Sequence, residues 1–293
     1  MVVFHGEAAL TLAYLSVSLN SFDPLVGMIW ENRPMTDAPE ALRKQTEDAA
    51  SLVAAAGSVA VLTGAGISTD SGIPDFRGPQ GVWTLNPGAE RASNIHVYLA
   101  EPEVRKVNWR AMASGVWDGV EPNVGHRALV DLDRRGGLHT LVTQNVDGLH
   151  LMAGTDPEHV VEVHGTVRRS MCLECGVQDD IEVVLERVRS GEEDPRCARG
   201  SCDGLLKRAT VSFGQALFEG DLERALAAAA DADLLLAVGS TLAVGPVNLM
   251  VPTAVRAGRV VVIVNGSPTD MDDLADVVVR GSISELLPSI LSS

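Results

Sequence analysis

Residues 59–81 read VAVLTGAGISTDSGIPDFRGPQG, and this stretch decides the fold. It opens as an apolar, valine-rich run that is typical of a buried strand, and Gly64 and Gly66 follow directly. A strand that turns at glycines can present backbone N–H groups to a phosphate, although a simple strand-to-helix turn would use the same residues. Thr69 replaces the third glycine of the hydride-transfer fingerprint, so that fingerprint is not met. The polar segment after Gly66 lacks helical periodicity, and we expect a loop that closes over a ligand.

Composition and charge limit the class of protein. The chain has 293 residues, 46% of them hydrophobic, and a formal net charge of -16 at pH 7. This size and apolar content predict one large soluble domain with room for a small added module. The negative charge argues against binding to nucleic acid or to an anionic membrane, and it is compatible with basic peptide partners.

The first 34 residues match neither an export signal nor a membrane span. No Lys or Arg precedes Arg33, and no continuous apolar run reaches the roughly 20 residues that a bilayer requires. We therefore treat residues 1–34 as an N-terminal extension and expect the folded domain to begin at Met35, just before a helix cap. Without an export signal we expect a cytoplasmic protein with reduced cysteines. The oligomeric state stays open.

Strand-like and helix-like segments alternate along most of the chain. Predicted strands cover residues 59–62, 140–143, 160–163, 234–238, 260–264 and 277–279, and predicted helices cover residues 38–56, 95–100, 102–113, 126–135, 221–230, 246–257 and 284–291. Residues 81–123 contain no strand-like run, so we read them as a helical excursion. The alternation predicts an α/β fold with a doubly wound parallel sheet, whose ligand crevice lies outside the carboxyl ends of the strands.

The four cysteines form two closely spaced pairs. Cys172 and Cys175 are separated by two residues, and Cys197 and Cys202 by four. Tetrahedral zinc needs four such ligands on two tight turns, so the spacing favours a structural zinc site over free or redox-active thiols. A closed four-thiolate site leaves the metal no open position and therefore no catalytic role.

Polar or small residues follow four of the predicted strands. They are Gln144, Asn145 and Asp147; His164; Gly239, Ser240 and Thr241; and Asn265, Gly266 and Ser267. Small polar groups at neighbouring strand ends suit the riboses and the adenine of a dinucleotide. An imidazole near its free pKa can deprotonate a hydroxyl at neutral pH, so His164 is a candidate base, with a structural hydrogen bond as the alternative. We interpret the other histidines after the extension as structural or surface residues: His96, His126, His139, His150 and His159.

Taken together, the motifs resemble the sirtuin family of NAD-dependent protein deacylases, in its bacterial form. The matching stretches are GAGIS at 64–68, GIPDFR at 72–77, QNVD at 144–147, HG at 164–165, the four cysteines, FG at 213–214, GST at 239–241 and Asn265. They span residues 50–291 in the family's order. The chain departs from the family at Arg208, where Pro is frequent, and at Gln215, where Glu is frequent.

The resemblance implies a catalytic domain over residues 35–293. It divides into a Rossmann-like part (35–80, 124–165 and 210–293), a helical excursion (81–123) and a zinc module (166–209), with one structural zinc. NAD would be a consumed co-substrate, and an acyl-lysine peptide or protein would add a strand near residues 211–214 and near Gly245.

The resemblance also implies roles for individual residues. His164 and Asn145 would be catalytic, with His164 as the base. Cofactor contacts would come from Gly64, Ala65, Gly66, Ser68, Asp75, Phe76, Arg77, Gln144, Asp147, Gly239, Ser240, Thr241, Asn265, Gly266, Ser267 and Ile283. We expect Phe76 and Arg77 to form a ligand-ordered tip.

The implied reaction removes acetyl or longer acyl groups from lysine and yields nicotinamide and O-acyl-ADP-ribose. Asn108 and Ala111 stand where members that remove succinyl groups carry Tyr and Arg, so we expect no preference for acidic acyl groups. The alternatives are a protein mono-ADP-ribosyltransferase that uses the same NAD site and a zinc-containing NAD sensor without catalysis.

Overall fold

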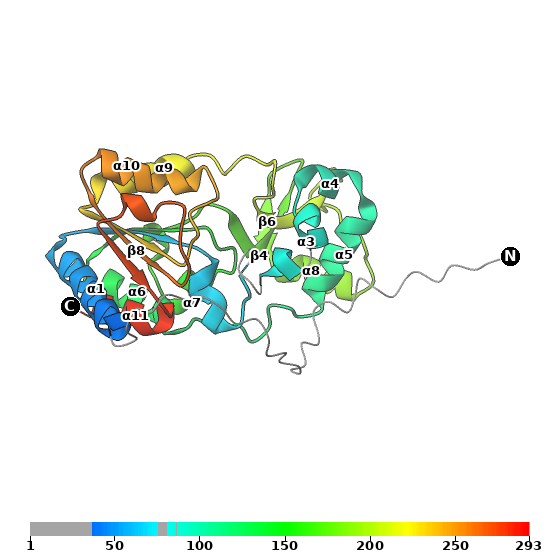
Figure 1. Ribbon diagram of the computed structural model, residues 1–293. Coiled ribbons are helices and arrows are strands. Elements are labelled where there is room, and N and C mark those ends of the chain that lie inside the picture. The colour runs from blue at the N-terminus through cyan, green and yellow to red at the C-terminus, as the bar shows by residue number, and fades with distance from the viewer. Residues whose placement is uncertain (1–36, 76–80, 86, 293) are drawn as a thin grey trace, which may run out of the picture. The chain divides into compact units, whose positions relative to one another are not determined.

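Figure 1 shows the computed structural model, which describes residues 37–75, 81–85 and 87–292. The chain divides into two units, residues 1–37 and residues 38–293, and the fold below belongs to the second. Phe76 and Arg77 lie outside the described residues, so the predicted ligand-ordered tip stays a prediction. None of the described helices is both long and apolar enough to cross a bilayer.

A six-stranded parallel sheet forms the centre of this unit. Its strands, in spatial order, are β3 (Val160–Glu162), β2 (Leu138–Thr143), β1 (Val59–Thr63), β7 (Leu234–Val238), β8 (Val260–Asn265) and β9 (Val277–Arg280). Every residue of β1 and β7 is buried, which is why these strands read as continuous apolar runs in the sequence.

Helices cover both faces of this sheet, as the alternating pattern predicted. One face packs against α1 (Asp37–Ala55), α6 (Val124–Arg134) and α11 (Ile283–Leu291), and the other against α9 (Asp221–Asp231) and α10 (Met250–Arg256) (Figure 1). Val61 belongs to the first apolar cluster and Leu62 to the second, because successive strand side chains point to opposite faces. The chain leaves β1 toward β2 on one side and later returns to β7 on the other. The switch point between β1 and β7 is therefore where a ligand is expected.

The prediction of a loop after the glycine turn was wrong for residues 65–71. They form a 3-10 helix, η1 (Ala65–Ser71), which ends at Gly72 with a positive φ of 87°. The predicted helix at 246–257 is broken into η3 (Val247–Leu249) and α10. Further short helices are α7 (Leu149–Ala153), η2 (Pro157–His159) and η4 (Asp272–Leu274).

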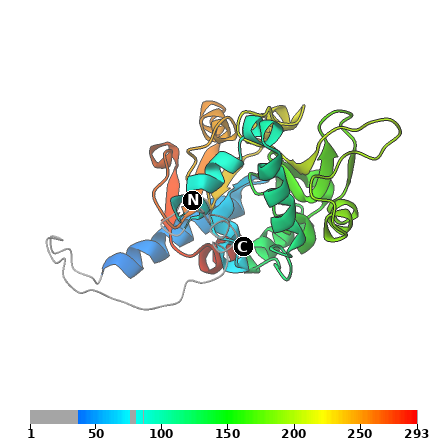
Figure 2. The ribbon, with the colours of Figure 1, turned by 90° about the vertical axis from the view of Figure 1, so that its right-hand side faces the viewer.

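A smaller antiparallel sheet carries the cysteines, and the sequence did not reveal its strands. Its order is β5 (Gln178–Asp180), β4 (Gly165–Cys172) and β6 (Leu206–Thr210), with α8 (Ile181–Arg189) beside it. Residues 82–113 form α2 (Val82–Leu85), α3 (Pro87–Ala92), α4 (Ile95–Ala100) and α5 (Pro102–Ala113). Trp109 and Met112 of α5 share one apolar cluster with Val167 and Leu206 of the sheet, and Figure 2 shows these helices beside the green strands.

A buried ion pair ties α5 to the loop before the third cysteine. Arg105 is 3% exposed, and its guanidinium contacts Asp194 through Nε and Nη2, the latter at 2.8 Å. Its Nη1 donates to the carbonyl oxygens of Tyr98 and Leu99. One arginine thus joins α4, α5 and the cysteine-bearing segment.

Candidate active site

Three glycines bring the ends of β1 and β7 into backbone contact. The Gly66 N–H donates to the Gly239 carbonyl at 2.8 Å, and the Gly64 N–H donates to the Val238 carbonyl at 2.9 Å. A Cβ on Gly64 would lie 2.7 Å from the Gly239 carbonyl oxygen, and one on Gly66 would lie 2.8 Å from the Gly239 Cα. The glycines are therefore required by the neighbouring backbone itself, before any phosphate is considered.

Beside this contact lies a buried polar cluster. Ser68 is 1% exposed, Asn145 5% and Asp147 4%. The Asn145 side-chain amide donates to the Gly64 carbonyl at 3.0 Å and to Ser68 Oγ at 3.1 Å, and Ser68 Oγ donates to Asp147 Oδ2 at 2.8 Å. Burial raises the pKa of Asp147, while the hydrogen bonds from the Leu149 N–H and from Ser68 oppose the shift.

His164 lies in the turn between β3 and β4, and a hydrogen bond fixes its ring. Nδ1 is 2.9 Å from the Gln144 carbonyl oxygen. A carbonyl only accepts, so Nδ1 carries the proton and Nε2 keeps a free lone pair. Burial lowers the pKa of His164 below its ordinary value, and the hydrogen bond to Gln144 partly offsets this. The neutral form, which can accept a proton, therefore predominates at pH 7.

Gly165 makes room for the strand that passes beside this histidine. Its φ is +70°, and a Cβ there would collide with the carbonyl oxygen of Ala209. The Val211 N–H donates to the His164 carbonyl at 2.8 Å. The backbone around the candidate base is thus held by β6 and the residues after it.

The structure links several other predicted cofactor residues to the same sheet edge. Gln144 Nε2 donates to Ser240 Oγ at 3.2 Å, and Ile283 packs against Gly239. At the end of β8, the Asn265 side-chain amide donates to the Ser267 carbonyl at 2.8 Å.

The other predicted cofactor residues lie around this cluster. Ala65 opens η1, and the Asp75 carbonyl accepts from the Val82 N–H. Thr241 and Gly266 are exposed at the ends of β7 and β8.

The donor set of this edge fits a dinucleotide. Buried hydroxyl, amide and carboxylate groups lie at the ends of β1 and β2, and a hydroxyl and an amide lie at the ends of β7 and β8. Glycines lie between these polar groups, so a ligand can approach the backbone there without meeting a side chain.

Sequence reasoning missed the residues that support this cluster from behind. Asn123 caps α6 and donates from its amide to the Ile67 carbonyl at 2.7 Å. Thr63 and Thr143 end β1 and β2 as register partners, and their hydroxyls lie 2.8 Å apart. A threonine at the end of each of two predicted strands was a signal that could have been read.

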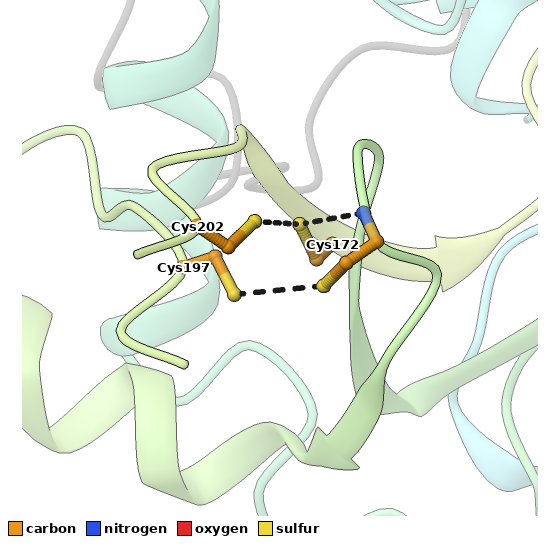
Figure 3. Close-up of side chains that lie close together, drawn as sticks. Cys172, Cys197 and Cys202 are labelled. Atoms are coloured by element: carbon orange, nitrogen blue, oxygen red, sulfur yellow. Dashed lines mark hydrogen bonds between the residues drawn. The ribbon is translucent and has the colours of Figure 1, made fainter. Parts of the chain in front are cut away.

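The four cysteines converge on one point (Figure 3). The Sγ atoms of Cys172 and Cys202 are 3.7 Å apart, those of Cys175 and Cys197 are 3.8 Å apart, and all four lie within 4.8 Å of one another. A zinc tetrahedron with Zn–S bonds of about 2.3 Å has sulfur–sulfur edges of about 3.8 Å. A Cβ on Gly204 would lie 2.7 Å from Cys172 Sγ. The thiolate set fits a structural zinc ion.

The edge where we expect a peptide strand is partly engaged within the chain. The Phe213 N–H donates to the Ser93 carbonyl, and the Phe213 carbonyl accepts from the Ile95 N–H, both at 3.0 Å. A peptide that pairs here must use other backbone groups of the segment or displace Ser93 and Ile95.

Comparison with known proteins agrees with this geometry. The Sir2 family profile matches residues 64–246. NAD-dependent protein deacetylase 2 of Streptomyces coelicolor is 44% identical over 233 residues, which cover 80% of this chain and 96% of that protein. NAD-dependent protein deacetylase 1 of Bradyrhizobium diazoefficiens is 40% identical over 249 residues, covering 84% of this chain and 95% of that protein.

Solved structures give the same result. A Sir2 with a p53 peptide and NAD+ is 30% identical, with a TM-score of 0.73 over 84% of this chain and 97% of that one. A Sir2 variant with a deacetylated p53 peptide and 3'-O-acetyl ADP ribose is 30% identical, with a TM-score of 0.75 and the same coverage. With its fold, its four-cysteine cluster and these matches, the chain belongs to the Sir2 family, the sirtuins.

Proposed function

We propose that this protein uses NAD and one water to remove acetyl or longer acyl groups from lysine side chains of peptides or proteins, giving nicotinamide, free lysine and O-acyl-ADP-ribose. Relatives named NAD-dependent protein deacetylases, and Sir2 complexes with NAD+ or with acetyl ADP ribose and peptide, support this reaction. The observation that carries it is His164, a neutral imidazole with a free Nε2 lone pair beside the Asn145–Asp147 turn.

In this reaction NAD supplies an electrophilic ribose carbon with nicotinamide as its leaving group. Asn145 and Asp147 hold the nicotinamide end, and Ser68 keeps both side chains in place through its hydroxyl. His164 accepts a proton at Nε2 from a ribose hydroxyl, and the Gln144 carbonyl stabilises the resulting imidazolium through Nδ1–H. Burial of the cluster excludes bulk water, which strengthens these interactions.

The decisive experiment incubates the protein with NAD and a panel of acetyl, longer-chain and acidic acyl-lysine peptides, with products identified by mass spectrometry. We expect deacylated peptide and O-acyl-ADP-ribose from acetyl or longer-chain peptides, and none from the acidic ones. His164→Ala should lower formation of O-acyl-ADP-ribose about 100-fold or more. His139→Ala is the control, because His139 is exposed on β2. Unchanged turnover in His164→Ala would refute the assignment of the base.

The names of the relatives do not favour the mono-ADP-ribosyltransferase alternative. The same experiment with labelled NAD separates the two reactions. Label that stays on the protein or peptide, with no O-acyl-ADP-ribose, would replace deacylation with ADP-ribosyl transfer.

Partners, location and domain division complete the proposal. Acyl-lysine peptides or proteins are the partners; the net charge of -16 supports the absence of a nucleic-acid or membrane partner. The cytoplasm suits the four reduced cysteines. The small sheet with its cysteines (166–209) and the helices of 81–123 form the parts that flank a Rossmann-like core within residues 35–293, after an N-terminal extension (1–34).

A further inference from the structure

Two buried histidines lie behind the polar cluster and take no part in the proposed chemistry. His126 of α6 is fully buried, and His150 of α7 is 2% exposed. Their ring centroids are 4.9 Å apart, with the planes tilted by 55°. Each imidazole carries two polar nitrogens that need partners inside a core, so the hydrogen bonds of this pair define what it can do.

His150 connects to the backbone of the candidate catalytic turn through two hydroxyls. Its Nε2 lies 2.9 Å from Thr63 Oγ1. The Thr63 hydroxyl donates its only hydrogen to Thr143 Oγ1, so His150 Nε2 is the donor to Thr63. Thr143 Oγ1 also accepts from the Asn145 N–H at 3.1 Å. His150, Thr63 and Thr143 therefore form one chain of hydrogen bonds that ends on the Asn145 backbone.

His126 connects to η1 through Asn123. Its Nδ1 lies 3.3 Å from the Asn123 backbone nitrogen, which donates to it. The Asn123 side-chain amide donates to the Ile67 carbonyl at 2.7 Å and to Ser71 Oγ at 3.0 Å. His126 thus orients Asn123, whose side chain connects η1 to the start of α6.

The two branches meet again at the candidate site. Asn145 at the end of one branch and Ser68, in the η1 helix at the end of the other, are hydrogen bonded at 3.1 Å. We infer that His126 and His150 are positioning residues, which hold η1 and the Asn145–Asp147 turn at the spacing that NAD requires. This inference rests on the proposed function, because it assigns NAD to that site.

The pair can do this only while both rings are neutral. Nε2 of His126 and Nδ1 of His150 are buried, and neither has a hydrogen-bond partner in the described part of the chain. In the neutral pair both rings carry their hydrogen on Nε2. A further proton would go to His126 Nδ1, where it would displace the hydrogen bond from the Asn123 N–H, or to His150 Nδ1, which has no acceptor in the described part of the chain. Burial lowers the pKa of both histidines, in keeping with a neutral contact.

Two substitutions at one position test the inference. His150→Phe keeps a ring but removes the donor to Thr63, whereas His150→Gln keeps an N–H at similar reach. We expect His150→Phe to weaken NAD binding about tenfold by calorimetry, the effect of one lost buried hydrogen bond. It should raise KM for NAD more than it lowers kcat, and it should speed amide exchange across residues 64–73 in the NAD-free protein. His150→Gln should restore each value, and His139→Phe on the exposed surface should match the wild type.

Wild-type NAD affinity and wild-type amide exchange in His150→Phe would overturn the inference. A lower melting temperature with unchanged NAD binding would also overturn it, because that result describes a purely structural role. If His150→Phe does not fold, Thr63→Val breaks the same link without changing the shape of the side chain, and the same criteria apply. Failure of the wild type to bind NAD would instead refute the proposed function, while exchange in the NAD-free protein still tests the positioning.

Discussion

At the scale of single residues, His164 becomes a base through one hydrogen bond and partial burial. The Gln144 carbonyl selects the tautomer with Nε2 free, and burial keeps the ring neutral by lowering its pKa. The sequence could place a histidine at the end of a strand, but it could not show which nitrogen is free. That choice depends on a carbonyl 20 residues earlier in the chain.

The first prediction concerns the pH dependence of turnover. Because the pKa of His164 is lowered, the acidic limb of kcat/KM should have its midpoint below about 6.5, the ordinary histidine value. Burial raises the pKa of the nearby Glu162 to about 7, so a limb near pH 7 would report that carboxyl instead. A pH profile of the wild type beside Glu162→Gln distinguishes the two. A midpoint at or above 6.5 that survives Glu162→Gln would contradict the proposed state of His164.

A second prediction at this scale concerns Gly165. Gly165→Ala combines a positive φ of 70° with a collision against the Ala209 carbonyl, so it should lower the free energy of unfolding by about 3 kcal/mol or more. Gly136→Ala is the matched control, because its φ is +76° and its surroundings are open. It should cost only about 1 kcal/mol. Urea denaturation measures the free energy of unfolding of both variants. Equal losses would show that the backbone at Ala209 moves away and avoids the collision.

At the scale of elements, η1 shows where local sequence reasoning stops. Residues 65–71 have no apolar periodicity, which is why a loop was expected. The structure fastens this segment from outside, since Asn123 donates to Ile67 and Ser71 and Asn145 donates to Ser68. A helix held by distant side chains leaves little trace in its own sequence.

The third prediction concerns the Arg105–Asp194 ion pair, which links α5 to the segment that carries the cysteines. Asp194→Ala leaves the buried Arg105 without its carboxylate, so it should lower the free energy of unfolding by about 3 kcal/mol. Glu47→Ala removes an exposed ion pair with Arg43 on α1 and should have no measurable effect. Similar denaturation midpoints for the two variants would mean that the Arg105 pair adds nothing beyond a surface pair.

The fourth prediction concerns zinc. Cys172→Ser removes one of four converging thiols, so the purified protein should lose its single equivalent of zinc and melt at a lower temperature. Ser201 is exposed and lies between Cys197 and Cys202, so Ser201→Ala should keep the zinc content and the melting temperature of the wild type. Plasma mass spectrometry and thermal melting are the measurements. A full equivalent of zinc in Cys172→Ser would refute the four-thiolate site.

At the scale of the whole molecule, the large sheet was predictable and the small one was not. The central strands β1, β7 and β8 are buried on both faces, so each appears as a short apolar run before a glycine or a polar cluster. The strands of the small sheet read LKRAT and QDD at 206–210 and 178–180, and only the cysteine spacing marked their region. Their packing follows from the converging cysteines and from Trp109 and Met112, which belong to a helix that precedes the whole sheet in the chain.

The fifth prediction concerns stability against acid. Burial lowers the pKa of His126 to about 4, so between pH 6.5 and pH 4 the unfolded chain binds a proton there that the folded chain does not. Stability is therefore lost as the pH falls through this window, by about 2 kcal/mol at pH 5 from His126 alone. His150 acts in the same direction, and Glu162 acts against both.

Urea denaturation at pH 7 and pH 5 of the wild type and of His126→Gln isolates this contribution, because the other groups are common to both. The wild type should lose more stability than the variant. An equal loss in the two proteins would show that His126 is protonated in the folded state.

The contact among Gly64, Gly66 and Gly239 also constrains how this protein can change over evolutionary time. When a side chain grows in an ordinary core, a neighbour can shrink and restore the fit. Here each position meets backbone atoms of the opposing turn, which a smaller neighbouring side chain does not remove. A genetic selection for suppressors of an alanine at any of the three should therefore return true revertants and no second-site compensation within the trio.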